Sequence, residues 1–249
     1  MATDGRHPFL GVNLDPTNPG GRPLVRELGQ LGWARVIARP GPQLTIVANY
    51  MHRLHMAGVK TGLVLARESF TGPPAGWGAQ AGWYVQTCRP TAVIVGNEMD
   101  AYLLDAESPS SWTMTPEAYN ALVDNLRVYL MDYVYPRPLL IIGGQVSGQP
   151  GGWLPEVNIG EFDGIDIHPY GKGPQEMSEL LMAYRELYHF PLYVFEWSVP
   201  AEEIPEYVRL LGRLGVQAAC YFCWSDAMVP GFGLIGSAEY PVLMEEART

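Results

Sequence analysis

The stretch that decides the fold is Ala92-Val93-Ile94-Val95-Gly96-Asn97-Glu98, in which four apolar residues lead into a glycine, an amide and a carboxylate. A short, continuous apolar run of this kind is typical of a strand buried on both faces of a parallel sheet. Leu139-Leu140-Ile141-Ile142 has the same character. Runs of this kind predict eight strands in all, at residues 9–14, 35–38, 61–66, 92–96, 139–143, 164–168, 192–196 and 218–224.

Helical patterns lie between most of these runs. Residues 44–57 carry apolar side chains at helical spacing. Thr115-Pro116-Glu117 has the features of an N-cap, a proline at the first helical position and an acid in the first turn, which predicts a helix to about residue 133. Further helices are expected at 175–188 and 205–214. Gly and Pro interrupt the pattern after the first, third and fifth strands.

Strands that alternate with helices predict a parallel α/β architecture. Eight such units in 249 residues, or about 31 residues each, fit a (β/α)8 TIM barrel, with residues 1–249 forming a single catalytic domain. The alternative is an open doubly wound sheet. No G-x-G-x-x-G follows the first strand, and Gly143-Gly144 alone does not indicate a dinucleotide site.

Composition excludes several classes of protein and partner. Hydrophobic residues make up 47% and charged residues 17% of the chain, which argues against disorder. A net charge of −10 repels phosphate backbones, so nucleic acid is not expected as a partner. No apolar run approaches the length of a membrane span. Residues 1–8 lack the basic and apolar regions of a signal peptide, and the compartment stays open. We expect a monomer without a membrane partner.

Polar side chains are concentrated at the ends of the predicted strands. In a barrel the carboxyl ends of the strands share one face, where the chemistry of such enzymes takes place. A purely structural explanation does not require polar residues at so many strand ends. The residues in question are Asp15, Arg39, Arg67, Glu68, Asn97, Glu98, Gln145, Ser147, His168, Tyr170, Glu196, Trp224 and Asp226.

Two glutamates stand out because each directly follows an apolar strand. They are Glu98 and Glu196. A single glutamate in such a place is more often a helix cap or a surface ion pair. Two that face each other across a barrel mouth are the machinery of glycoside hydrolysis, in which one carboxyl group protonates the leaving oxygen. The other attacks the anomeric carbon or activates a water that does so.

The sequence resembles the clan A glycoside hydrolases, a group of retaining (β/α)8 enzymes that includes the family five cellulases and the family thirty-nine enzymes. In that clan an Asn-Glu pair ends strand four and its glutamate is the acid/base, while a glutamate ending strand seven is the nucleophile. Asn97-Glu98 and Glu196 fall on those strands. The resemblance implies a carboxyl separation of about 5–5.5 Å and double displacement on a β-linked oligo- or polysaccharide, with neither metal nor organic cofactor.

The resemblance extends to four further residues and spans essentially the whole chain. Arg39 matches an arginine ending strand two, and a nearby cation would keep Glu196 ionised. His168 and Tyr170 match a His-x-Tyr segment on strand six, where Tyr170 can donate to the same carboxylate and His168 can position a glutamate or a substrate hydroxyl. Trp224 matches a tryptophan ending strand eight, which would form the floor under the sugar. Asn97 can bind a hydroxyl beside the reacting carbon.

Aromatic residues in the loops are candidates for stacking on further sugar rings. Trp77, Trp112 and Trp153 fall in the loops after the third, fourth and fifth strands, and Phe232 lies in the last loop. They predict an open cleft for a polymer. The alternative is that they are hydrophobic lids on the barrel rim.

Several other interpretations are weaker. Cys220 and Cys223 form a C-x-x-C, but residues three apart on a strand point to opposite faces, so these thiols and Cys88 are expected to be buried and structural, with no metal. Residues 163–170 resemble the chitinase signature D-G-x-D-x-D-x-E, but His168 and Tyr170 replace its third aspartate and its catalytic glutamate. The remaining alternatives are a carbohydrate-binding barrel without catalysis, and a barrel lyase or isomerase.

Overall fold

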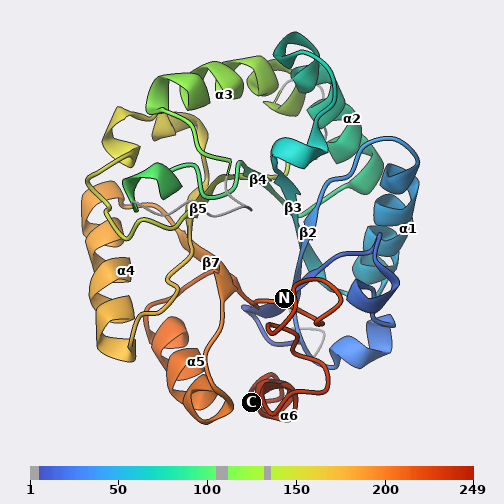
Figure 1. The fold of residues 1–249 in the computed structure, drawn as a ribbon, viewed down its shortest axis with the longest axis vertical. Helices are drawn as coiled ribbons and strands as arrows, with labels where there is room; N and C mark the ends of the chain where they lie inside the picture. The colour runs from blue at the N-terminus through green and yellow to red at the C-terminus, as the bar shows by residue number, and fades with distance from the viewer. Residues whose placement is uncertain (1–5, 105–111, 132–135) are drawn as a thin grey trace.

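The computed structural model describes residues 6–104, 112–131 and 136–249. Eight parallel strands form a closed barrel in which each strand pairs with its neighbours in the sequence and the last pairs with the first (Figure 1). The predicted (β/α)8 barrel is therefore confirmed. The strands are β1 Leu10–Leu14, β2 Trp33–Ile37, β3 Lys60–Leu65, β4 Ala92–Val95, β5 Leu139–Gln145, β6 Gly164–Ile167, β7 Leu192–Trp197 and β8 Ala219–Tyr221.

A ring of helices surrounds the barrel (Figure 1). Among the described residues the α-helices are α1 Pro42–Met56, α2 Trp77–Cys88, α3 Pro116–Met131, α4 Pro174–Tyr188, α5 Ile204–Arg213 and α6 Glu239–Glu246. The first and fifth connections hold short 3-10 helices instead, where Gly and Pro interrupt the sequence. None of the described helices combines the length and the apolar character needed to cross a bilayer.

Alternate residues of each strand face two separate hydrophobic cores. One core fills the barrel and includes Trp33, Ile94 and Phe195, and the other lies between the strands and the helices and includes Ala34 and Val36. Trp33 fills much of the barrel interior, since its ring packs edge-on against Tyr193 and Phe195 at 6.4 and 5.8 Å. Arg35 lies two residues after Trp33, so the period-two alternation sends its side chain into the barrel as well.

Most strand boundaries differ from those expected by one to three residues, and two of these differences concern the site. β2 begins at Trp33, two residues before the expected start at Arg35, because the aromatic ring finds a buried place within the barrel. β8 ends at Tyr221, so Trp224 lies beyond the strand. Both differences change which side chains reach the mouth of the barrel.

Candidate active site

Glu196 reaches the barrel mouth because β7 contains an irregularity. Phe195 faces the barrel interior, while Val194 and Trp197 belong to the outer core. Strict alternation would place Glu196 on the outer side with Val194. The register against β8 shifts between Val194 and Trp197, and the extra residue turns Glu196 inward, where it is 6% exposed.

Glu98 is held by an unusual turn after β4. Its φ is 53°, in the left-handed region, and Gly96, two residues earlier, has a φ of 86°. The Glu98 amide donates a hydrogen bond to the Gly144 carbonyl at 3.0 Å. A left-handed conformation costs a glutamate about 1–3 kcal/mol and persists only where the surroundings fix it. The backbone at Glu98 is therefore strained, and the surrounding contacts hold it so that the carboxyl group keeps its position.

Two glycines of β5 allow this close approach. A Cβ at Gly143 would lie 2.3 Å from the Gly96 carbonyl oxygen, and a Cβ at Gly144 would lie 2.2 Å from the imidazole ring of His168. Any side chain at either position would meet atoms closer than van der Waals contact allows. Gly143-Gly144 is thus explained by packing between the ends of β4, β5 and β6.

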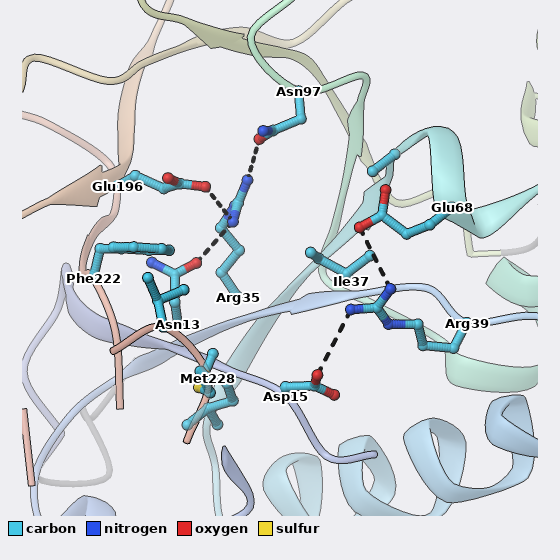
Figure 2. Close-up of a pocket in the computed structure, with 13 residues that line it drawn as sticks. Asn13, Asp15, Arg35, Ile37, Arg39, Glu68, Asn97, Glu196, Phe222 and Met228 are labelled. Carbon is cyan, nitrogen blue, oxygen red and sulfur yellow. Dashed lines mark hydrogen bonds and ion pairs between the residues drawn. The ribbon is translucent and has the colours of Figure 1, made fainter. Parts of the chain in front are cut away.

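The two carboxyl groups and one imidazole come together at the barrel mouth. One oxygen of Glu98, one of Glu196 and one ring nitrogen of His168 all lie within 4.8 Å of one another, and the three residues are buried. Beside them is a pocket of about 160 Å³ whose lining includes Glu196, Asn97 and Phe222 (Figure 2).

Arg35 is the cation beside Glu196, at 2.6 Å from its Oε1. The same guanidinium donates to Asn13 Oδ1 at 2.9 Å and to Asn97 Oδ1 at 2.6 Å (Figure 2). Arg39 does not make the expected contact with Glu196. It lies on the pocket rim, where its side chain is 3.6 Å from a carboxylate oxygen of Asp15 and 3.4 Å from one of Glu68. Arg39 follows the strand, whereas Arg35 lies within it and points into the barrel.

His168 links three carboxyl groups. Its Nδ1 is 3.1 Å from Glu98 Oε1 and 3.7 Å from Glu196 Oε2, and its Nε2 is 3.1 Å from Asp166 Oδ2. Burial alone lowers the pKa of His168, but attraction by Glu196 and Asp166 and the hydrogen bonds to Asp166 and Glu98 outweigh it and raise the pKa to about 10. His168 is therefore an imidazolium at neutral pH.

Asp166 and Tyr170 complete the network. Asp166 is fully buried, and its second oxygen accepts a hydrogen bond from the Phe195 amide at 2.8 Å. It thus touches both His168 and the backbone beside Glu196. The Tyr170 hydroxyl donates a hydrogen bond to Glu196 Oε2 at 2.5 Å, as expected. Burial and the nearby Glu196 raise the pKa of Tyr170 well above its usual value, so it stays a donor.

The charges of this buried cluster nearly balance. Arg35 and His168 supply two positive charges, and Glu98, Glu196 and Asp166 supply three carboxyl groups. Uncompensated buried charge is costly, so the cluster is most stable when one carboxyl group holds a proton. Glu98, His168 and Glu196 have the spacing of metal ligands. Both ring nitrogens of His168 are directed at carboxyl groups of the protein, Nδ1 at Glu98 and Nε2 at Asp166.

Trp224 does not form the floor of the pocket. It is 2% exposed and packs edge-on against Tyr240 of α6 at 5.9 Å. Because β8 ends at Tyr221, Phe222 is the aromatic residue that reaches the pocket. The three cysteines are buried free thiols.

The three loop tryptophans do not line the catalytic pocket. Trp153 is fully buried and packs against Tyr119, with its indole N–H donating to the Met114 carbonyl at 2.9 Å. Trp77 and Trp112 contact each other edge-on at 5.6 Å and line a separate hollow beside α2 and α3. Among the described residues Trp153 is therefore buried at the barrel rim, while Trp77 and Trp112 stay partly exposed along a hollow that shares no lining residue with the catalytic pocket.

Asp166, interpreted from the sequence as a strand residue that supports a neighbouring side chain, does so for His168. Sequence reasoning missed three other residues of the site. Asn13 and Arg35 are polar residues within otherwise apolar strands, and that contrast is the signal that can find them. Phe222 carries no such signal, because it is one apolar residue among several at the end of β8.

Known proteins were compared with the chain in sequence and in structure. No family model matches it, and no curated protein matches it in sequence. The β-glycosidase BGL167 aligns with a TM-score of 0.66 over 97% of this chain and 96% of that chain, at 13% identity. Endo-glycoceramidase II from Rhodococcus sp. aligns with a TM-score of 0.56 over 88% of this chain and 73% of that chain, at 12% identity.

A third neighbour is the endo-β-mannanase/endo-β-glucanase PbGH26A-GH5A of Prevotella bryantii. It aligns with a TM-score of 0.65 over 96% of this chain at 12% identity, and this chain spans 48% of its length. At these identities the likeness shows the fold. The chain has the (β/α)8 barrel of these glycosidases, which is the fold that its resemblance to the clan A glycoside hydrolases implied.

Proposed function

We propose that the protein is a retaining glycoside hydrolase that cleaves β-glycosidic bonds by double displacement. The observation that carries the proposal is the pair of buried carboxyl groups, Glu98 and Glu196, with oxygens within 4.8 Å of each other at the carboxyl ends of β4 and β7. Inverting enzymes hold their carboxyl groups about 6.5–9.5 Å apart to admit a water between them, and retaining enzymes about 5–5.5 Å apart. The short distance favours direct attack.

In the first step Glu196 acts as the nucleophile. Its carboxylate attacks the anomeric carbon while the bond to the leaving oxygen breaks, and Glu98 gives its proton to that oxygen. The products are a glycosyl ester on Glu196 and a free alcohol. Arg35 and the Tyr170 hydroxyl bind the two oxygens of Glu196 and orient the carboxylate before attack.

In the second step Glu98 acts as a base. It takes a proton from a water that attacks the anomeric carbon, the ester bond breaks, and Glu196 returns to its carboxylate form. Two inversions give net retention of configuration. We assign the proton of the buried cluster to Glu98, since Glu196 is ion-paired with Arg35, while Asp166 accepts hydrogen bonds from His168 and a backbone amide.

Aryl β-glycosides test the proposal. Wild-type protein is expected to release the phenol, and proton NMR of the first product is expected to show the β anomer. Glu196→Ala should abolish turnover. Glu98→Ala should still be glycosylated by substrates with good leaving groups, and added azide should then accelerate turnover and yield a β-glycosyl azide.

Glu202→Ala is the matched control, because Glu202 is also a glutamate, is exposed, and lies in the short 3-10 helix that follows β7. If the first product is the α anomer, the enzyme inverts the configuration and the double-displacement mechanism is wrong. A glycosyl azide of retained configuration from the Glu196 variant, with an inverted one from the Glu98 variant, would exchange the two roles. Sugar binding without any turnover would identify a carbohydrate-binding barrel instead.

A further inference from the structure

A second cavity lies beside the catalytic pocket, at the ends of β7 and β8. It has a volume of about 460 Å³, and its walls are the segment 198–200 and the loop that follows β8. Phe222 lines both this cavity and the catalytic pocket. The loop contributes Met228 and Val229 to the pocket and Gly231 and Phe232 to the cavity, so it borders both spaces.

Aromatic rings connect the nucleophile to the second cavity. Tyr170, which donates to Glu196, contacts the ring of Phe222 edge-on at 6.2 Å. Phe222 in turn contacts the ring of Phe232 at 5.9 Å. Phe232 is 48% exposed, although it is a large apolar residue. A path of aromatic surface therefore leads from the reacting centre to solvent, and such surface suits the apolar faces of sugar rings.

The polar residues of the cavity determine the charge of its ligand. They are Ser198, Asp226, Ser237 and Glu239, and none of the residues that line it is basic. Asp226 Oδ1 already accepts hydrogen bonds from the Gly231 and Gly233 amides, at 3.0 and 2.8 Å, which partly compensates its charge. An anionic ligand would be repelled, while hydroxyl groups find hydrogen-bond acceptors.

We propose that this cavity binds the sugar unit next to the one held at Glu196, which makes the enzyme selective for uncharged oligosaccharides over glycosides of a single sugar. This inference rests on the proposed function. In this proposal Phe232 and the cavity bind the remote sugar, a role that the sequence had suggested for the loop tryptophans. Binding energy from a remote unit helps to position the reacting one.

The test varies the length of the sugar substrate and removes the exposed ring of Phe232. The substrates are aryl β-glycosides of glucose, mannose and xylose and of the neutral tetrasaccharides built from them. We expect wild-type kcat/KM to be higher on a tetrasaccharide than on its monosaccharide. Phe232→Ala should lower that ratio about fivefold to tenfold through loss of a stacking surface. Ile235→Ala is the matched control, since Ile235 is 44% exposed in the same segment and lines neither space. It should leave the ratio unchanged.

Two results would overturn the inference. One is an unchanged ratio in Phe232→Ala, and the other is equal or faster cleavage of tetrasaccharides made of uronic acids. Failure of the proposed function is distinguishable, because no glycoside would then be hydrolysed. In that case calorimetric titration of the same neutral tetrasaccharides decides the inference. Weaker binding to Phe232→Ala than to wild type would support the cavity assignment, and equal binding or none to wild type would reject it.

Discussion

Gly144→Ala tests whether catalysis depends on the position of His168. The added Cβ would lie 2.2 Å from both Cε1 and Nε2 of the ring and 2.6 Å from Cδ2. Non-bonded carbon atoms need about 3.5 Å, so the ring must move by more than about 1 Å. His168 has little freedom to do so, because its nitrogens are 3.1 Å from Glu98 and 3.1 Å from Asp166.

A displacement of this size has a large expected effect on rate and a smaller one on stability. A misplacement of 1 Å in a catalytic array costs about 100-fold, so kcat on an aryl glycoside should fall by about that factor. Overpacking costs about 1–3 kcal/mol, which leaves most domains folded. Gly151→Ala is the control, since Gly151 lies in the loop after the same strand with no atom within 4 Å of the added Cβ. It should keep wild-type activity.

The measurements are kcat, the thermal unfolding midpoint and the crystal structure of the variant. A folded Gly144→Ala protein with kcat within about threefold of wild type would refute the reasoning, since a shift of the ring would then have no catalytic consequence. If the single variant does not fold, Gly144→Ala combined with His168→Ala removes the clash. That double variant should fold and stay inactive.

Three other predictions concern the cation at Glu196, the imidazolium and the core. Arg35→Lys should lower kcat about 100-fold, because lysine cannot bind the same three partners, while Arg39→Lys at the rim should lower it far less. The pKa of His168 is raised above its unfolded value, so the charged imidazole stabilises the fold fully below about pH 6.5, and this stabilisation is lost as the pH rises toward 10. The thermal unfolding midpoints of wild type and His168→Asn should therefore converge over this pH range. Trp153→Ala should destabilise the fold by about 3–5 kcal/mol in a denaturant titration, because this ring is fully buried.

The sequence predicts the barrel because its strands are buried on both faces. Ala92–Val95 is apolar at every position and the other strands are largely so, and eight such runs, most of them separated by helical patterns, fit a closed barrel. The same runs locate Glu98 and Glu196, because a strand end is visible where apolar residues give way to polar ones.

The facing of individual side chains is harder to predict. Arg35 and Arg39 are four residues apart and have the same parity on an extended chain, so only the boundary of β2 decides between them. The bulge in β7 leaves no mark in the sequence, although Glu196 depends on it. Trp153 was expected as a sugar-stacking surface at the rim, but it is buried against the ring of Tyr119, a residue far from it in the sequence.

The charge count of the buried cluster has a consequence for the whole reaction cycle. In the free enzyme, by the mechanism we propose, Arg35 and His168 balance Glu196 and Asp166, while Glu98 is neutral. In the glycosyl-enzyme Glu196 is an uncharged ester and Glu98 has lost its proton, so the same two cations balance Glu98 and Asp166. The interior of the barrel therefore carries zero net charge in both resting states. The negative charge moves from one wall of the mouth to the other, across a gap that His168 spans.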